Sequence, residues 1–120
     1  MKKSELKIAI VDDHVDSVTS LSNYLEGRGI KTIWGYTEEK AIEICDKENP
    51  SLLIINIEID GEKTGFNIAK EYPSINILFI SGSEILRTKA SKISNAVGII
   101  SKPIDQEEVY NFIVSKFGAN

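Results

Sequence analysis

Five polar side chains of chemically useful types are spread over most of the chain: Asp12, Asp13, Asn56, Ser81 and Lys102. Two adjacent carboxylates suit a hard divalent cation such as Mg²⁺, which takes oxygen ligands and keeps several waters. A hydroxyl and an ammonium beside them suit phosphoryl oxygens, and the ammonium would offset the crowded negative charge. If they meet, these groups predict a phosphoryl-transfer site in which the protein mainly positions groups and neutralises charge.

Each of these residues also has an ordinary structural explanation when it is considered alone. Asp12 or Asp13 would serve as a cap for the helix that follows, and Ser81 would serve in a turn or as a cap. Lys102 would be a solvated surface lysine, and we expect His14 to be an exposed first-turn residue and not a ligand. The prediction of one shared site therefore rests on the joint occurrence of these residues at the ends of predicted strands.

The stretch 51–59 is the strongest indication of the sheet that would bring them together. It follows Pro50 and begins with an almost wholly apolar run without alternation, which is typical of a strand buried on both faces of a parallel sheet. Asn56 comes at the carboxyl end of this strand, and in open parallel sheets that edge is where ligands bind.

Strands and helices alternate regularly along the rest of the chain. We predict strands over 6–11, 31–36, 75–80 and 97–100, and helices over 15–28, 38–48, 66–71, 84–93 and from about 106 onward. Thr37 and Asp105 are the expected N-caps of the second and last helices. The apolar face of the last helix holds Val109, Phe112, Ile113 and Phe117. This pattern predicts an α/β fold with one parallel sheet and helices on both faces. We expect one domain over 1–120, with its core over about 6–117.

Composition excludes several functional classes. The chain has 120 residues and a formal net charge of −4, and its basic residues are scattered, which argues against direct nucleic-acid binding. No run of about 18 apolar residues indicates a membrane span, and no signal region follows Met1, so we expect a cytoplasmic protein. Cys45 is the only cysteine, which excludes an internal disulfide and a paired-cysteine metal site, and we expect it to fill core.

Taken together, these motifs resemble the receiver domain of two-component response regulators over about 6–117. The resemblance rests on Asp12-Asp13, the stretch 50–65, Ser81 in its Phe-Ile-Ser-Gly context, and Lys102-Pro103. It implies a flavodoxin-like, doubly wound five-stranded parallel sheet of order 2-1-3-4-5. It also implies a regulatory module, not an enzyme, which takes a phosphoryl group from a histidine kinase or phosphotransfer protein in a phosphorelay.

The resemblance also implies roles for individual residues. For the metal it assigns Asp12, Asp13, Asn56 and the backbone carbonyl of Glu58, and for the phosphoryl group it assigns the acceptor position 56, the switch hydroxyl Ser81 and Lys102. Gly65 would open the third helix, and the Lys102-Pro103 bond would be cis. Mg²⁺ is the implied cofactor, and no residue is assigned to an organic one.

Two positions depart from the family pattern. The acceptor position holds Asn56, whose neutral amide is a poor nucleophile and whose NH₂ group donates hydrogen bonds, so the usual acyl phosphate should not form and Mg²⁺ should bind more weakly. The sequence leaves open a natural pseudo-receiver or an Asp-to-Asn change made to block phosphorylation. Ile99 stands where the family commonly has Tyr or Phe, which puts the usual switch coupling in doubt.

Two other functional classes compete with this interpretation. A small flavodoxin-like flavin-binding protein would need a phosphate-cradling loop after the first strand, and the acidic pair would repel that phosphate. A phosphohydrolase with an aspartate nucleophile would want two carboxylates separated by one residue, whereas Asp12 and Asp13 are adjacent. In the favoured interpretation, the surface over 84–100 contacts a downstream protein partner, and the same surface is a candidate for homodimerisation.

Overall fold

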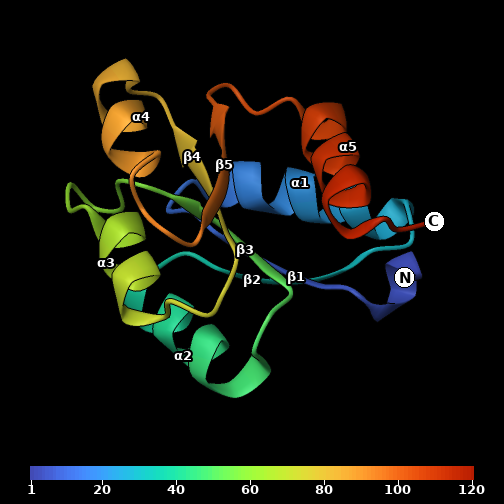
Figure 1. Cartoon of the computed structure of the whole chain (residues 1–120). Coiled ribbons are helices and arrows are strands. Elements are labelled where there is room, and N and C mark those ends of the chain that lie inside the picture. Colours follow the sequence, from blue (N-terminus) through green and yellow to red (C-terminus); the bar gives the residue numbers. More distant parts are fainter.

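Five short strands form one parallel sheet in the order β2-β1-β3-β4-β5 in the computed structural model, which describes residues 1–120 (Figure 1). In chain order the strands are β1 (Lys7–Val11), β2 (Lys31–Gly35), β3 (Leu52–Asn56), β4 (Ile77–Ser81) and β5 (Ala96–Ser101). The predicted strand order and the parallel pairing are therefore confirmed. The strand predicted within 51–59 ends at Asn56, and Ile59 instead forms an isolated bridge with Glu62.

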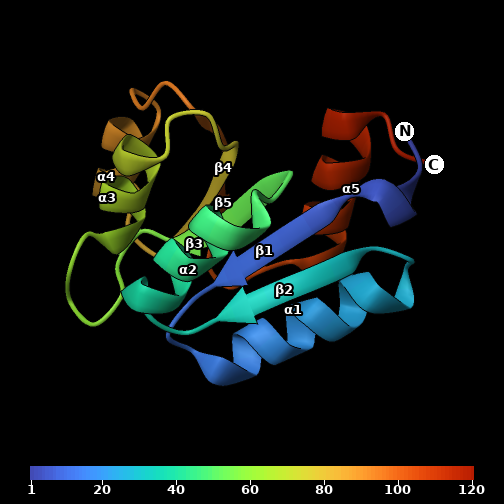
Figure 2. The same ribbon diagram turned by 90° about the horizontal axis from the view of Figure 1, so that it is seen from below.

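Five α-helices cover the two faces of this sheet, and a short 3₁₀ helix, η1 (Lys3–Glu5), precedes β1. The helices are α1 (Val15–Gly27), α2 (Glu38–Glu48), α3 (Thr64–Glu71), α4 (Glu84–Ala90) and α5 (Gln106–Phe117). Helices α1 and α5 pack on one face and α2, α3 and α4 on the other (Figures 1 and 2). This is the doubly wound arrangement that the alternation of elements predicts.

The central strand β3 is buried on both sides, as its apolar run predicts. Leu53 and Ile55 belong to the cluster under α2, α3 and α4, while Leu52 and Ile54 belong to the cluster under α1 and α5. Successive side chains of a strand point to opposite faces, so one strand feeds both clusters. Cys45 is buried in the first cluster, which confirms its predicted place in the core.

Two of the predicted helix caps are confirmed. The Thr37 hydroxyl accepts a hydrogen bond from the Lys40 N–H, and the Asp105 carboxylate accepts from the N–H groups of Glu107 and Glu108. The predicted apolar face of α5 also packs against the sheet, with Val109 and Ile113 buried and Phe112 and Phe117 partly buried.

Helix α4 is shorter than the sequence pattern indicates, because it ends at Ala90 and not at Ile93. The segment that follows is held by Asn95, whose Nδ2 donates to the carbonyl oxygens of Ala69, Tyr72 and Ile75 at 3.0, 3.0 and 2.9 Å. These long-range contacts fix a turn where local spacing favours helix. No helix of the chain is both long enough and apolar enough to span a bilayer.

Candidate functional site

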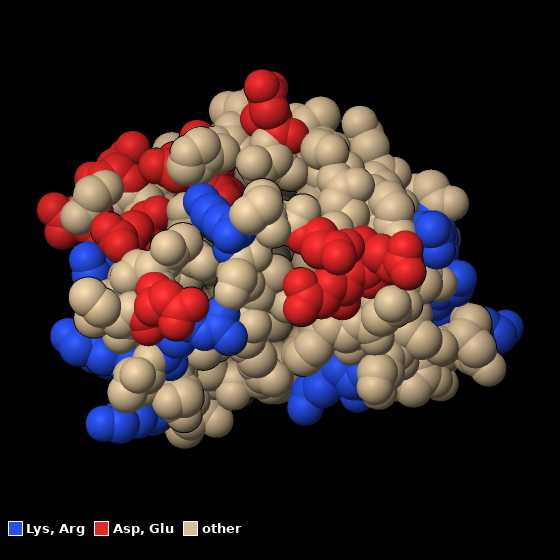
Figure 3. Space-filling model, turned by 90° about the horizontal axis from the view of Figure 1, so that it is seen from above, with Lys and Arg blue, Asp and Glu red and all other residues tan.

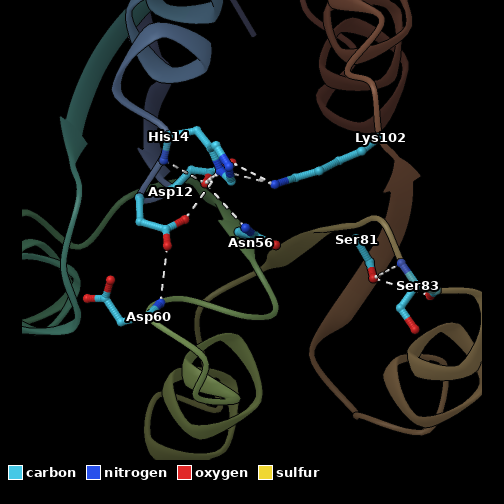
Figure 4. A network of polar contacts seen from close by, with 8 residues as sticks. Asp12, His14, Asn56, Asp60, Ser81, Ser83 and Lys102 are labelled. Carbon is cyan, nitrogen blue, oxygen red and sulfur yellow. Dashed lines mark hydrogen bonds and ion pairs between the residues drawn. The ribbon is translucent and has the colours of Figure 1, made fainter.

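The carboxyl ends of the parallel strands share one rim, and the predicted site residues lie along it. Asp12 and Asp13 follow β1, Asn56 ends β3, Ser81 ends β4, and Lys102 follows β5. Figure 4 shows Asp12, Asn56 and Lys102 pointing toward one another at this rim. The sheet thus brings together residues that are far apart along the chain.

Asp12 is the hub of the polar contacts. Its side chain is 1% exposed, and its Oδ1 accepts from the His14 backbone N–H at 3.1 Å, from His14 Nδ1 at 3.1 Å and from Asn56 Nδ2 at 3.2 Å. Its second oxygen, Oδ2, has no hydrogen-bond partner and lies 3.5 Å from Lys102 Nζ, an ion-pair distance. The structure therefore joins three of the predicted residues directly.

The surroundings of Asp12 favour its ionised form. Burial alone would raise the pKa of Asp12, but hydrogen bonds from the backbone and the ring of His14, together with the charge of Lys102, hold that pKa below its ordinary value of 3.8. A carboxylate that accepts several hydrogen bonds in a buried place remains charged at neutral pH and is available to a cation.

Asp13 is oriented by the loop after β3. Its Oδ2 accepts from the Asp60 backbone N–H at 3.1 Å, and Asp60 has a positive φ of 52°. Its Oδ1 is buried without a hydrogen-bond partner and lies 3.4 Å from His14 Nδ1. The side chain of Glu58 forms an ion pair with Lys63 at 3.6 Å, and the ligand that the resemblance implies at this position is its backbone carbonyl.

Asn56 is 5% exposed and uses its NH₂ group as a donor to Asp12. Gly65, at the start of α3, packs directly on the end of this strand. A Cβ at Gly65 would lie 2.8 Å from the Ile57 Cα and 2.9 Å from the Asn56 carbonyl oxygen, so any side chain there would collide with backbone. The predicted role of Gly65 in opening the third helix thus has a steric basis.

Ser81 lies on the rim but does not join the contacts around Asp12. Its hydroxyl accepts from the Ser83 N–H at 3.0 Å and donates to the Ser83 carbonyl at 3.2 Å, which is the turn role also foreseen from the sequence (Figure 4). Ser83 occupies the N-cap position of α4 without a side-chain cap hydrogen bond. The Lys102 N–H donates to the Ser81 carbonyl at 3.1 Å, which ties the two strand ends together.

Two further sequence expectations concern β5 and the turn after it. The Lys102-Pro103 peptide bond is cis, as the resemblance implied. Ile99 is partly buried against the cluster under α2, α3 and α4. A cleft of about 320 Å³ beside Lys102 and Pro103 extends to Ser17 and Ser20 on α1.

The sequence interpretation underestimated His14. Its side chain is 65% exposed, as expected, but its Nδ1 contacts both carboxylates and lies 3.5 Å from Lys102 Nζ. It also takes the N-cap position of α1 without a side-chain cap hydrogen bond, so neither aspartate is the N-cap residue. The only feature of the sequence that could have indicated this role is that His14 directly follows the acidic pair.

The residues present fit a divalent cation. Two buried carboxylate oxygens, Asp12 Oδ2 and Asp13 Oδ1, lack hydrogen-bond partners, and such oxygens are costly unless a cation or donor satisfies them. Figure 3 shows acidic side chains gathered in patches on this face, with basic side chains between them and along its edges.

Comparisons with known proteins agree with this architecture. A family model described as response regulator receiver domain matches residues 8–114. Sporulation initiation phosphotransferase F of Bacillus subtilis (strain 168) is 28% identical over 108 residues, which are 86% of this chain and 86% of that protein.

Solved structures share the fold at low sequence identity. A CheY-like receiver domain protein from Methanospirillum hungatei JF-1 has a TM-score of 0.82 at 20% identity and covers 94% of both chains. A two-component response regulator from Clostridium difficile has a TM-score of 0.85 at 20% identity and covers 94% of this chain and 96% of its own.

Proposed function

Because this chain belongs to the response regulator receiver domain family, we propose that it is a two-component signalling module whose phosphoacceptor chemistry is blocked at Asn56. The observation that carries this proposal is the hydrogen bond from Asn56 Nδ2 to Asp12 Oδ1 at 3.2 Å. It places the amide of position 56 against the acidic pair, at the end of the central strand. An acceptor carboxylate would have to attack phosphorus from this position.

The replaced group explains why the chemistry is blocked. A carboxylate oxygen carries negative charge and can form an acyl phosphate, whereas an amide oxygen is neutral and a poor nucleophile. The NH₂ group also satisfies Asp12 Oδ1, a contact that a carboxylate at position 56 cannot make. The proposed module therefore stays in one phosphorylation state.

The remaining groups have roles in binding and charge neutralisation. Asp12, Asp13, the Asn56 side-chain oxygen and the Glu58 backbone carbonyl would hold Mg²⁺, whose charge would offset that of a phosphoryl group. Ser81 and Lys102 would contact the phosphoryl oxygens in a protein with an intact acceptor. With two carboxylates in place of three, Mg²⁺ binds more weakly here.

The proposed partners are proteins. A histidine kinase or phosphotransfer protein would approach the rim, and a downstream partner, or a second copy of the chain, would contact the surface over 84–100. Ile85, at the start of α4, is 81% exposed, and most of β5 is only partly buried, so this surface has apolar area available for contact.

The test is phosphorylation by a small phosphodonor. Incubation with acetyl phosphate and Mg²⁺ should leave the mass of this protein unchanged and add one phosphate to its Asn56→Asp variant. Asn111→Asp, the same change at an exposed position of α5, is the matched control and should stay unmodified. A phosphorylated product from the unaltered chain would overturn the assignment of Asn56.

A further inference from the structure

The His14 imidazole supplies a nitrogen donor beside the acidic pair. Its Nδ1 lies 3.1 Å from Asp12 Oδ1 and 3.4 Å from Asp13 Oδ1, and one donor atom from each residue lies within 4.8 Å of the others. Zinc–nitrogen and zinc–carboxylate bonds are about 2.0–2.2 Å long, so neighbouring ligands of one ion stand about 3 Å apart. The His14 Nδ1 therefore lies at a ligand-to-ligand distance from one oxygen of each carboxylate.

Unpartnered oxygens point to a ligand independently of this spacing. The Asp12 side chain is 1% exposed, yet its Oδ2 has no hydrogen-bond partner, and the buried Oδ1 of Asp13 has none either. Asp13 Oδ2 is held by the Asp60 N–H, which leaves Oδ1 on the side of His14. Such outer contacts orient metal ligands, and an ion here would satisfy the free oxygens.

The donor set decides which class of ion fits. Mg²⁺ prefers oxygen ligands in a near-octahedral arrangement, whereas imidazole suits ions such as Zn²⁺, Co²⁺ and Ni²⁺. We propose that His14, Asp12 and Asp13 form a transition-metal site that prefers Zn²⁺ or Co²⁺ to Mg²⁺. This inference rests on the proposed metal site and specifies its ligand and ion.

Lys102 opposes the ion at the same place. Its Nζ lies 3.5 Å from His14 Nδ1 and 3.5 Å from Asp12 Oδ2, so its ammonium competes with a dication for the same groups. Like charges at this distance repel, and removing the ammonium should favour metal binding. Lys102→Met should therefore bind Zn²⁺ several-fold more tightly than the unaltered chain.

His14 is the only histidine and Cys45 the only cysteine, and Cys45 is buried with its pKa raised to about 11 by burial. A tag-free protein thus has one imidazole to observe. Titration with Zn²⁺, followed by calorimetry and by imidazole ¹H–¹⁵N NMR, should shift the His14 ring signals at one equivalent. Co²⁺ should give visible absorption bands with the same stoichiometry.

Variants at His14 decide the proposal. His14→Ala and His14→Gln should each weaken Zn²⁺ binding at least tenfold and should change Mg²⁺ binding far less, since Mg²⁺ takes oxygen ligands and not imidazole nitrogen. Zn²⁺ affinity that is equal in these variants, or ring signals that do not move, would overturn the proposal. Phosphorylation of Asn56→Asp with Mg²⁺ is a separate measurement that tests the proposed function. The Zn²⁺ titrations test only the role of His14, so either result can be negative without the other.

Discussion

At the scale of single residues, the amide of Asn56 is expected to stabilise the metal-free protein. Asn56→Asp would place a third carboxylate beside Asp12 and Asp13 and would remove the 3.2 Å hydrogen bond to Asp12. Crowded like charges and the lost donor should lower the free energy of unfolding by about 1–3 kcal/mol. Urea unfolding in the presence of a chelator measures this difference, and a variant as stable as the unaltered chain would contradict it.

Magnesium should reverse part of that loss. A ligand that binds only the folded state raises Tm more as its dissociation constant falls, with a logarithmic dependence, so Mg²⁺ should raise the Tm of Asn56→Asp more than that of the unaltered chain. Asn111→Asp, which adds the same charge on the exposed side of α5, is the control and should show no extra shift. Equal shifts in Asn56→Asp and the unaltered chain would argue against this site.

Asp12 links stability to pH. Its pKa is lowered in the folded state, because the hydrogen bonds from His14 and the charge of Lys102 outweigh the opposing effect of burial. Because its pKa is lower in the folded state, ionised Asp12 contributes to the free energy of unfolding. This contribution is fully present above the pKa of the unfolded state, near 3.8, and is lost as the pH falls through the pKa of the folded state. Asp12→Asn should therefore be less stable than the unaltered chain at pH 7.

The stability of Asp12→Asn at low pH distinguishes this effect of Asp12 ionisation from a simple packing defect. Urea unfolding of both proteins across the acid range should show the stability gap closing as the pH drops below about 4, because Asp12 itself becomes protonated. Asp16→Asn, at an exposed position of α1, removes the same charge without these contacts and serves as the control. A gap that stays constant down to the lowest pH would refute the linkage.

At the scale of elements, the sequence predicts most of what positions the site. The apolar runs of β3 and β4 identify strands buried on both faces, and Asn56 ends its strand as predicted. The strand order came from the family resemblance, because alternation alone fixes parallel pairing and not which strands are neighbours. What local patterns miss are contacts made across the fold.

Three features illustrate that limit. The three hydrogen bonds of Asn95 follow a helix that stops at Ala90, although the spacing of apolar residues continues to Ile93. The His14 ring meets Lys102 only because β1 and β5 end at the same rim. The Ser81 hydroxyl forms hydrogen bonds within its own turn. The sequence leaves open whether this hydroxyl has a turn role or a role in the phosphoryl site.

The junction of β3 and α3 depends on a missing side chain. Gly65→Ala would place a Cβ 2.8 Å from the Ile57 Cα and 2.9 Å from the Asn56 oxygen, and neither backbone atom can yield without moving the site. Despite the better helix propensity of Ala, by about 1 kcal/mol, we expect a net loss of about 1–3 kcal/mol. Gly27→Ala, with no atom within 4 Å of its Cβ, is the matched control and should be neutral or stabilising. Thermal unfolding of both variants tests this, and equal Tm changes would contradict it.

At the scale of the whole molecule, the two faces of the sheet carry separate apolar clusters of 17 and 15 buried residues. No side chain belongs to both clusters, so any cooperativity between them in unfolding must pass through the sheet. The rim site draws on both layers, because the acidic pair leads into α1 on one face while the loop after Asn56 leads into α3 on the other. Its geometry therefore holds only while both layers are folded.

Two conservative changes test whether the layers unfold together. Ile44→Val in α2 and Ile113→Val in α5 each remove one buried methylene from opposite clusters, and each should cost about 0.5–1.5 kcal/mol. Because the sites share no partners, the double variant should lose the sum within about 0.5 kcal/mol. Fluorescence of Trp34, the only tryptophan and half-exposed on the edge strand β2, and far-UV circular dichroism should report one shared urea transition in all three variants. If Ile113→Val separates the two transitions, the layers are independent units, and the sheet does not couple them through the shared strand β3.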